Sequence, residues 1–397
     1  MTVEYHDGLL AIDLAGEPYQ LGWQHGRLLR HEIWALWDAC ERLILRARGR
    51  WVGWVASQVL HGAARLMHLY IPPALRRELQ GVAAGSGLPY HHLLLLNCFD
   101  DVMNNFRVVD RLAARLACTA FAAGGARAAD GTAIAGRNLD YYFRAEFMAA
   151  GAEPTRVLQR HVVVFRVRPR HGLPFVAVGW PGIIGAVTAQ NAAGLALACL
   201  TSPAWSERPW GTPLPLVYRG IAQFAPGLAH AVERLRAARR TIGNNLVLAS
   251  ATERAVCTVE LSARAVDASP PVGEVVVTSN HYLSPRLARE QDALINPTSP
   301  LRLARARALL AEGPLDVARA QAILLDEECL DPAAPQWARL YNAGTIYSTV
   351  FEPGAGRIWV RAADTPDRRF VPFAVPDARP RASVPGGAPA EHPAAGH

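Results

Sequence analysis

A cysteine and an Arg-x-x-Asp motif are the residues of this sequence whose types and spacing could do chemistry together. Cys118 opens a run of small apolar residues that is typical of a strand, and after a glycine-rich turn a second such run ends in Arg137 and Asp140. A hairpin built from these two runs would bring the returning strand beside the first. We therefore expect Arg137 and Asp140 to lie within reach of the Cys118 sulfur.

Each residue type in this set has a distinct chemical role. A thiolate is a nucleophile, and a guanidinium such as that of Arg137 lowers a thiol pKa from its usual value of about 8.5. Arginine cannot accept a proton, so it can orient and stabilise but cannot be the base. The sequence contains no lysine, so a catalytic amine would have to be an α-amino group. If the peptide bond before Cys118 is cut, the new α-amine, with a pKa of about 7.7–8.0, could take the thiol proton while Asp140 holds it in position.

Composition and charge argue against several classes of protein. With 397 residues, 51% of them apolar and 19% charged, the chain can bury a large core and should be mostly globular. The net charge is +7, but the arginines are scattered singly and no stripe of aromatic and basic residues accompanies them. We therefore expect an ordinary solvated basic surface and no nucleic acid partner.

Cysteine and histidine spacing argues against a metal centre. The six cysteines, at positions 40, 98, 118, 199, 257 and 329, are far apart, and no C-x-x-C pair and no His-rich spacing occurs. We expect no zinc site, no disulfide framework and no cofactor, and we expect the cysteines other than Cys118 to be inert. Residues 1–16 lack the basic start and apolar run of a secretory signal, and no apolar stretch reaches the ~18 residues of a membrane span. These observations predict a cytoplasmic protein.

The apolar periodicity changes at Cys118. Residues 1–117 have mostly helical spacing, clearest in Gln24–Ile44 and Ala74–Ala84, whereas short strands follow. Strands are expected at 118–123, 132–138, 161–168, 174–180, 184–190, 195–200, 245–250, 255–262, 274–279, 344–351 and 356–361, with a helical stretch at 213–240 and two helical patterns over about 300–325. The pattern predicts an α+β fold of two sheets covered by helices. We expect a helical segment 1–117, a catalytic region 118–374, and a Pro-, Ala- and Gly-rich disordered tail 375–397.

The residues around Cys118 resemble those of a known family. Cys118-Thr119 followed by Gly136-Arg137-Asn138-Leu139-Asp140-Tyr141 is similar to the motif of N-terminal nucleophile (Ntn) hydrolases of the isopenicillin N / acyl-CoA:6-aminopenicillanic acid acyltransferase-like family. Penicillin V acylases, bile-salt acylases and acid ceramidase-type amidases are related to it. Further segments resemble the family in the same order along the chain: Gly22-x-x-His25-Gly26, Glu78–Gly85 with Asn97, Gly185–Leu195, Thr278–Tyr282 and Ser299-x-x-Arg302.

The resemblance implies a four-layer αββα Ntn-hydrolase sandwich with a helical N-terminal pro-segment. It also implies autocatalytic cleavage, in which Cys118 first attacks the carbonyl of Ala117 and later attacks a substrate. Arg137 and Asp140 would orient the reacting groups. The new amine, rather than His281, would be the base.

The resemblance also implies two supporting residues. Asn280 would donate to the oxyanion or hold the new amine, and one such oxyanion donor contributes about 3–4 kcal/mol to lowering a barrier. Arg302 would be a second cation of the site. Thr201 stands where the related acylases have an asparagine, which leaves the second oxyanion donor unassigned.

The sequence leaves the reaction partner open. Hydrolysis of a small linear amide or acyl thioester is the leading prediction, and N-acyl transfer from an acyl-CoA is the alternative within the family. A different class, a non-catalytic protein with peripheral membrane contact, is suggested by Arg46–Tyr70. An interfacial helix interleaves apolar and basic residues in this way, here Trp51, Trp54, Val55, Val59 and Leu66 with Arg48, Arg50 and Arg65. The oligomeric state is not predicted.

Overall fold

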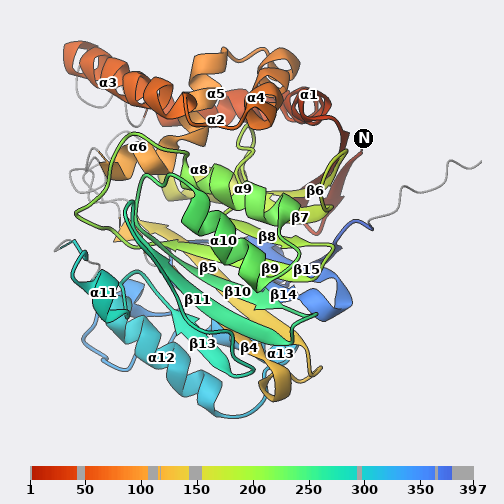
Figure 1. The fold of residues 1–397 in the computed structure, drawn as a ribbon, viewed down its shortest axis with the longest axis vertical. Coiled ribbons are helices and arrows are strands. Elements are labelled where there is room, and N and C mark those ends of the chain that lie inside the picture. Colours follow the sequence, from red (N-terminus) through yellow and green to blue (C-terminus); the bar gives the residue numbers. More distant parts are fainter. Residues whose placement is uncertain are drawn as a thin grey trace, which may run out of the picture.

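Two β-sheets stacked face to face form the centre of the molecule, and helices cover both outer faces (Figure 1). The structure is a computed structural model that describes residues 2–42, 50–105, 115–116, 118–142, 154–292, 297–362 and 365–377. The layers follow the order helix, sheet, sheet, helix, which confirms the predicted αββα sandwich.

Within the described residues, the first sheet contains nine strands, in the order β1-β2-β6-β7-β8-β9-β10-β11-β12. Neighbouring strands are antiparallel except for β2 and β6, which pair in parallel. The bounds are β1 (Val3–His6), β2 (Leu9–Gly16), β6 (Val163–Pro169), β7 (Phe175–Gly179), β8 (Thr188–Asn191), β9 (Leu195–Thr201), β10 (Asn244–Ser250), β11 (Ala255–Leu261) and β12 (Val266–Ala268).

The second sheet contains seven strands in the part of the chain that the structure describes, in the order β13-β4-β5-β14-β15-β16, with β3 paired to β5 outside this path. The bounds are β3 (Arg115–Leu116), β4 (Thr119–Gly124), β5 (Ala133–Tyr142), β13 (Val275–Thr278), β14 (Thr345–Glu352), β15 (Arg357–Ala362) and β16 (Val371–Ala374). The hairpin predicted from the sequence is β4–β5, in which Ala120 lies opposite Arg137.

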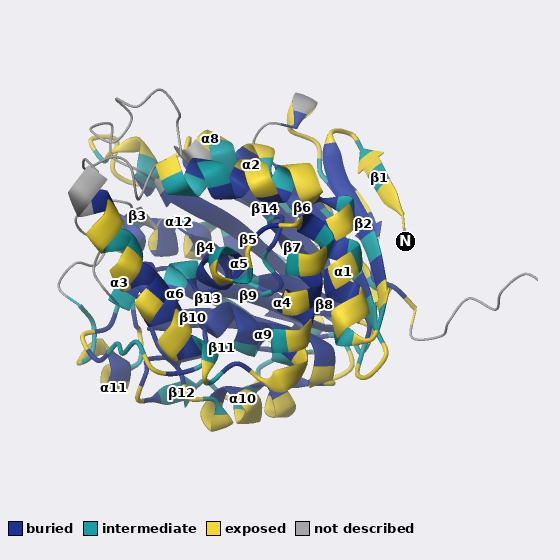
Figure 2. Cartoon of the chain, turned by 90° about the horizontal axis from the view of Figure 1, so that it is seen from above, coloured by how far each residue is buried: buried dark blue, intermediate teal, exposed yellow. Residues whose placement is uncertain are grey.

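Two groups of helices form the outer layers. The first sheet is covered by α1 (Pro18–Leu28), α2 (Arg30–Glu41), α3 (Arg50–His68), α4 (Pro73–Ser86), α5 (Tyr90–Asn97), α6 (Phe99–Asn105), α8 (Pro154–Arg160), α9 (Leu214–Phe224) and α10 (Leu228–Ala237). On the opposite side lie α11 (Pro285–Ala288), α12 (Ser299–Ala311) and α13 (Val317–Leu324). Seen from above, the helices turn exposed faces outward and the strands beneath them are buried (Figure 2).

Three hydrophobic cores join the four layers. Between α1–α10 and the first sheet lie residues such as Leu79 and Phe165, and between the second sheet and α12–α13 lie residues such as Phe121 and Leu303. The core between the two sheets is rich in alanine, for example at 120, 122, 133, 135, 196, 198 and 249. Side chains alternate between the two faces of a strand, so β4 turns Ala120 and Ala122 inward and Phe121 and Ala123 toward α12.

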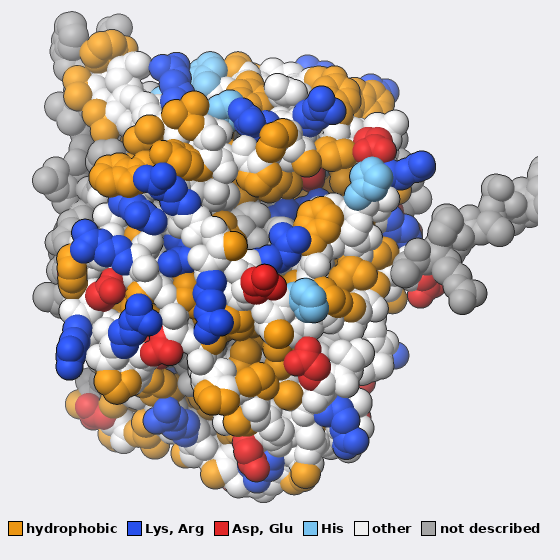
Figure 3. All heavy atoms as spheres, in the orientation of Figure 1, with side chains coloured by type: hydrophobic (Ala, Val, Ile, Leu, Met, Phe, Trp, Pro, Cys, Tyr) orange, Lys and Arg blue, Asp and Glu red, His pale blue; other side chains and the backbone are white. Residues whose placement is uncertain are grey.

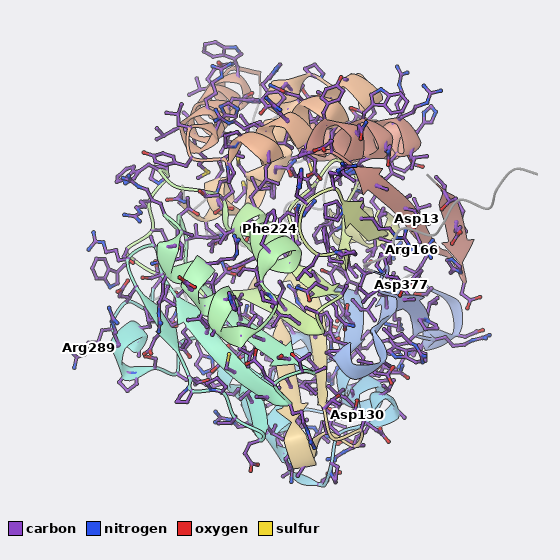
Figure 4. All side chains as sticks on the ribbon, turned by 45° about the vertical axis from the view of Figure 1, so that its right-hand side comes forward. Asp13, Asp130, Arg166, Phe224, Arg289 and Asp377 are labelled. Atoms are coloured by element: carbon purple, nitrogen blue, oxygen red, sulfur yellow. The ribbon has the colours of Figure 1, made fainter. Side chains whose placement is uncertain are left out.

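The N-terminal residues differ from the sequence-based expectation. Residues 3–16, where helical spacing was expected, form β1 and β2 instead, and β2 pairs with β6 in the register that sets Asp13 opposite Arg166. An ion pair of 2.8 Å between Arg166 Nη2 and Asp13 Oδ2 accompanies this register (Figure 4). Leu9–Leu14 is a nearly continuous apolar run, and such a run becomes a strand or a helix according to what it packs against. Pairing with β6 decides the outcome here.

The C-terminal tail is described only at its start. The backbone N–H of Val375 donates to the carbonyl of Gly356 at 2.8 Å, so residues 375–377 are tied to the end of the second sheet. The remainder of the predicted tail, residues 378–397, lies outside the described residues.

Helices α1 and α4 cross at a contact made by glycines. A Cβ atom added at Gly22 would lie 1.8 Å from the carbonyl oxygen of Glu78, and one added at Gly81 would lie 2.2 Å from that of Tyr19. Any side chain at these positions would push the two helices apart. The Gly22-x-x-His25-Gly26 segment therefore has a packing role at this crossing.

Candidate active site

Cys118 lies immediately before β4, at the end of the interface between the two sheets. Its side chain is only 2% exposed, and Sγ lies 3.7 Å from the main-chain carbonyl oxygen of Asp140 on the neighbouring strand. Burial raises the pKa of the Cys118 thiol, and the guanidinium of Arg137 opposes this shift. The thiol is therefore neutral in this form, and a nucleophilic attack by it requires a base.

Arg137 is buried on β5 and faces the same space as Cys118. Its Nη1 donates to the carbonyl of Val187 at 2.7 Å and also to the hydroxyl of Thr188, and the guanidinium lies over the ring of Tyr347 at 5.9 Å. The Tyr347 hydroxyl in turn lies 2.8 Å from the Thr188 hydroxyl. These contacts come from β8 and β14 and fix the cation beside the sulfur. Arg137 was predicted from the sequence, whereas its contacts with Thr188 and Tyr347 were not.

Asp140 is fully buried on the same strand. Its Oδ2 accepts a hydrogen bond from Asn342 Nδ2 at 3.2 Å, whereas Oδ1 has no hydrogen-bond partner among the described residues. Burial raises the pKa of Asp140 to about 7. The charge of Arg302 and the hydrogen bonds that Asp140 accepts act in the opposite direction. A buried carboxylate oxygen without a partner is costly, so this position favours a nearby donor.

Arg302 connects Cys118 to Asn280 from the helix side of the second sheet. From α12, its Nη1 donates to the main-chain carbonyl of Cys118 and, at 2.9 Å, to the hydroxyl of Thr119. Its Nη2 donates to Asn280 Oδ1 at 3.0 Å. The Asn280 Nδ2 donates to the carbonyl of Thr201 at 2.8 Å. The guanidinium and the amide thus link the start of β4 to the end of β9.

A cavity of about 160 Å³ opens beside the cysteine. Its walls are mainly apolar, and both Cys118 and Arg137 line it, whereas Asp140, Asn280 and Arg302 are not among the lining residues. The main apolar contributors are Leu36, Leu96, Phe99, Leu139, Tyr141, Leu158, Trp180, Ile183, Val187 and Cys199. The structure thus gathers the five predicted residues around one point, but only two of them face the open space.

One wall of the cavity is held by two polar residues of the N-terminal segment. The backbone N–H of Gly182 donates to His25 Nε2 at 2.9 Å, and burial lowers the pKa of His25 to about 3, so this ring is a neutral acceptor. Asn97 donates to the carbonyl of Gly182 and accepts from the N–H of Ile184, both at 2.8 Å. Segments that resembled the family in sequence therefore shape the cavity wall around Ile183.

One further polar residue of the cavity was missed from the sequence. Asp100, on α6, lines the cavity and accepts hydrogen bonds from Asn104 Nδ2 at 3.1 Å and Thr201 Oγ1 at 3.5 Å. Burial raises the pKa of Asp100 to about 6. Thr201 is thus paired with this carboxylate. The only signal in the sequence was a pair of acids, Asp100 and Asp101, after a run of four leucines.

His281 lies apart from the cavity. Its Nδ1 contacts Ser299 Oγ at 2.7 Å and Ser279 Oγ at 3.2 Å, and Ser299 also accepts from the backbone N–H of Asn280 at 2.9 Å. This arrangement fits the supporting role expected of His281. Ala117, on the other side of the expected cleavage point, lies outside the described residues.

Comparison with known proteins identifies one family. The family model described as "Acyl-coenzyme A:6-aminopenicillanic acid acyl-transferase" matches residues 127–367. An uncharacterized protein of Archaeoglobus fulgidus is 24% identical over 71% of this chain and 51% of its own length. Protein dcd1A of Dictyostelium discoideum is 24% identical over 68% of this chain and 63% of its own. The chain thus spans about half to two thirds of the length of these relatives.

Several solved structures align with this one. An N-acylethanolamine-hydrolyzing acid amidase ortholog of Caenorhabditis elegans covers 65% of this chain and 100% of its own, with 16% identity and a TM-score of 0.41. A conjugated bile acid hydrolase of Clostridium perfringens covers 65% and 92%, with 12% identity and a TM-score of 0.40. A penicillin V acylase of Agrobacterium tumefaciens covers 64% and 79%, with 13% identity and a TM-score of 0.31.

Proposed function

Because the chain belongs to the acyl-coenzyme A:6-aminopenicillanic acid acyl-transferase family, we propose that it is a self-processing cysteine amidohydrolase or acyltransferase that forms an acyl-enzyme on Cys118. Family membership and the two-sheet layered fold support an enzyme of the Ntn type that acts on acyl or amide bonds. The observation that carries the assignment to Cys118 is its position: the buried thiol and the cation Arg137 line the same apolar cavity. A thiol in such surroundings can receive an acyl group.

The maturation step frees the amine that the chemistry needs. The Cys118 sulfur attacks the carbonyl carbon of residue 117, the C–N bond breaks, and the nitrogen takes a proton and becomes an α-amine. Water then hydrolyses the thioester and releases the carboxylate of residue 117 and the thiol. The unpartnered Oδ1 of Asp140 supports this proposal, because the new amine would supply the missing donor. The pKa of this α-amine, near 7.7–8.0, suits a base that works at neutral pH.

Substrate turnover repeats the same chemistry. The amine takes the thiol proton, the sulfur attacks the acyl carbonyl, and the leaving group departs with the proton as the thioester forms. Water or an amine then attacks this thioester, and the thiol regains its proton. Arg137 would stabilise the thiolate. The apolar cavity walls support an acyl group as the buried part of the substrate.

Arg302 acts in this proposal by positioning, and Asn280 by donating to the oxyanion. Arg302 binds the main-chain carbonyl of Cys118, so it sets the direction of the nucleophile without facing the cavity. Asn280 is held between Arg302 and the carbonyl of Thr201. Its second amide hydrogen is the candidate oxyanion donor.

Intact mass measurement of freshly purified, full-length protein tests the proposal. We expect two fragments, 1–117 and 118–397, from the wild type and from Cys257→Ala, a buried cysteine distant from the cavity in sequence and sheet position. We expect a single chain from Cys118→Ala. Incubation with an acyl p-nitroanilide or an acyl-CoA should add one acyl mass to the 118–397 fragment, removable by hydroxylamine.

The two acyl acceptors are distinguished in the same assay. Hydrolysis, which we place first, releases free fatty acid without an added amine. Transfer gives an amide product only when an amine acceptor is supplied. A wild-type chain that stays whole, or acyl labelling that persists in Cys118→Ala, would contradict the assignment of the nucleophile.

A specific observation favours peripheral membrane contact as a second proposal. Helix α3 has an exposed apolar face made by Trp54, Val55, Val59 and Leu66 and continued by Leu69, and α3 contains no acidic residue. Figure 3 shows hydrophobic side chains gathered at the upper left, where α3 lies in Figure 1. Arg48 and the side chains of Arg50 and Trp51 lie outside the described part of the chain. Among the described helices, none is long and apolar enough to cross a membrane.

Liposome co-sedimentation tests this contact. We expect binding to vesicles with anionic lipid that weakens in high salt and is lost in Trp54→Ser/Val55→Ser. The absence of binding at low salt would contradict the proposed membrane contact.

A further inference from the structure

Three histidine rings meet between α3 and α5, away from the cavity of Cys118. His61 comes from α3, and His91 and His92 come from the first turn of α5. The ring centroids of His61 lie 5.4 Å from those of both other rings, and the rings of His91 and His92 lie 4.0 Å apart. One ring nitrogen from each residue can be chosen such that all three lie within 4.8 Å of one another.

The orientation of His61 is fixed by a hydrogen bond to its own helix. Its Nδ1 lies 2.8 Å from the carbonyl oxygen of Ser57, which can only accept, so Nδ1 carries the proton. The lone pair of His61 is therefore on Nε2, and this atom points into the cluster, where it accepts a hydrogen bond from His92 Nδ1 at 3.3 Å whose proton a metal ion would replace. A metal-binding histidine typically has its other ring nitrogen bonded to a carbonyl or carboxylate in this way.

The separation of these two nitrogens fits a shared metal ion. Zinc–nitrogen bonds of about 2.0–2.1 Å in a tetrahedron place two ligand nitrogens about 3.3–3.4 Å apart. The Nε2 of His61 and the Nδ1 of His92 already have this separation. The His92 ring is held by stacking on Trp37, with centroids 4.0 Å apart. His91 is exposed, so its side chain can turn toward the other two without disturbing the core.

Neutral imidazole is the form that binds metals, so a metal at this cluster competes with protons for the rings and should bind less tightly at acidic pH. The cation facing His91 is Arg65, on α3.

From this geometry we propose that His61, His91 and His92 form a binding site for a divalent transition metal, of which zinc is the probe we would use. Three imidazoles suit Zn²⁺, Cu²⁺, Ni²⁺ or Co²⁺, and water would complete the coordination. No metal site was predicted from the sequence, because the histidines show no spacing typical of one. His61 and His92 are 31 residues apart, and only the packing of α3 on α5 joins them.

The bound metal would tie α3 to α5. Helix α5 ends at Asn97, the residue that holds the cavity wall at Gly182 and Ile184. The site is therefore placed to stabilise the N-terminal helices. It rests on the histidines alone and is independent of the proposed acyl chemistry.

Metal binding to untagged, metal-stripped, full-length protein tests the proposal. We expect one Zn²⁺ per chain by equilibrium dialysis and an intense visible absorption on Co²⁺ binding, as four-coordinate cobalt gives. His91→Ala and His92→Ala should weaken zinc binding by at least about tenfold. His31→Ala, which removes an exposed histidine of α2, should bind as the wild type does. The same measurement on Cys118→Ala should be unchanged, which excludes the catalytic thiol as the ligand.

Thermal unfolding adds a readout that does not depend on dialysis. Zinc should raise the melting temperature of the wild type and of His31→Ala, but not that of His91→Ala. His91 is exposed, so this variant keeps the fold even if His61→Ala does not. Absence of stoichiometric zinc binding at concentrations up to about 1 mM, or equal binding by His91→Ala and the wild type, would overturn the proposal.

Discussion

Arg302 donates to Asn280, side chain to side chain, at 3.0 Å, and the same guanidinium binds the main-chain carbonyl of Cys118. One fully buried cation therefore determines both the direction of the strand that begins at Cys118 and the orientation of the Asn280 amide. This relationship joins α12 to the start of β4 and to Asn280, the second residue after β13. It predicts that the site depends on Arg302 for its geometry rather than for contact with substrate.

Arg302→Met should cost both stability and activity. It removes the donor to three buried acceptors, and a buried acceptor left without a donor typically costs about 1–3 kcal/mol. We expect a lower urea midpoint and loss of autocleavage. Arg307→Met, an exposed arginine on the same helix, is the matched control and should change the midpoint little. Full activity in Arg302→Met would show that Asn280 and Cys118 do not need this link.

Asp140 predicts a pH dependence of stability in the uncleaved chain. Its pKa is about 7 when folded, raised by burial, against an ordinary value of 3.8. The folded state thus binds the proton more tightly, so stability falls as the pH rises from about 4 to about 7. The single variant Cys118→Ala should lose stability as the pH rises over this range. The double variant Cys118→Ala/Asp140→Asn should lack the part of this loss that Asp140 causes. Melting temperatures of both variants measured from pH 4 to pH 8 check this. Parallel curves would contradict the buried, proton-binding carboxyl.

The position of Asp100 in the cavity predicts that it contributes to substrate binding. It is the carboxylate among the described lining residues, so we expect it to contact a cationic or hydrogen-bond-donating part of the substrate. Asp100→Asn should then raise KM by about tenfold with little change in kcat, as loss of uniform binding does. In the wild type, KM should rise below a pH of about 6 as the carboxylate is protonated. A loss confined to kcat would instead indicate a part in the reaction step.

Because glycines of α1 and α4 lie in close contact, adding a single methyl group at one of them should lower stability strongly. A Cβ at Gly81 would lie 2.2 Å from a backbone oxygen, so Gly81→Ala must separate the helices and should cost about 1–3 kcal/mol. Gly62→Ala is the control, since a Cβ at this position on α3 meets nothing within 4 Å. It should be neutral or stabilising by up to about 1 kcal/mol. Chemical denaturation of both variants measures the difference, and equal stabilities would exclude the close helix contact.

The sequence predicted the parts of the fold that local patterns determine. The β4–β5 hairpin and its register follow from short apolar runs on either side of a glycine turn, and they set Cys118 near Arg137 and Asp140. The bounds of β9 and β10 lie within one residue of the expected ones, and α12 begins one residue before the expected start of its helical stretch.

What the sequence could not predict depends on contacts between distant segments. The strand β2 forms because β6 pairs with it, and Asp100 enters the cavity because α6 packs against the end of β9. The support of Arg137 by Thr188 and Tyr347 joins residues from two sheets. None of these contacts leaves a periodic signal in the chain.

The position of β2 has a consequence for maturation. The segment before Cys118 supplies an internal strand of the first sheet, and Leu36, Leu96, Phe99 and Asp100 supply walls of the cavity. A backbone break after residue 117 would therefore nick one body rather than release a removable inhibitor. The two polypeptides would stay interwoven through a shared strand ladder and a common apolar interior. Separating them would require unfolding the enzyme, so the mature form is expected to migrate as one particle in native conditions and as two bands only after denaturation.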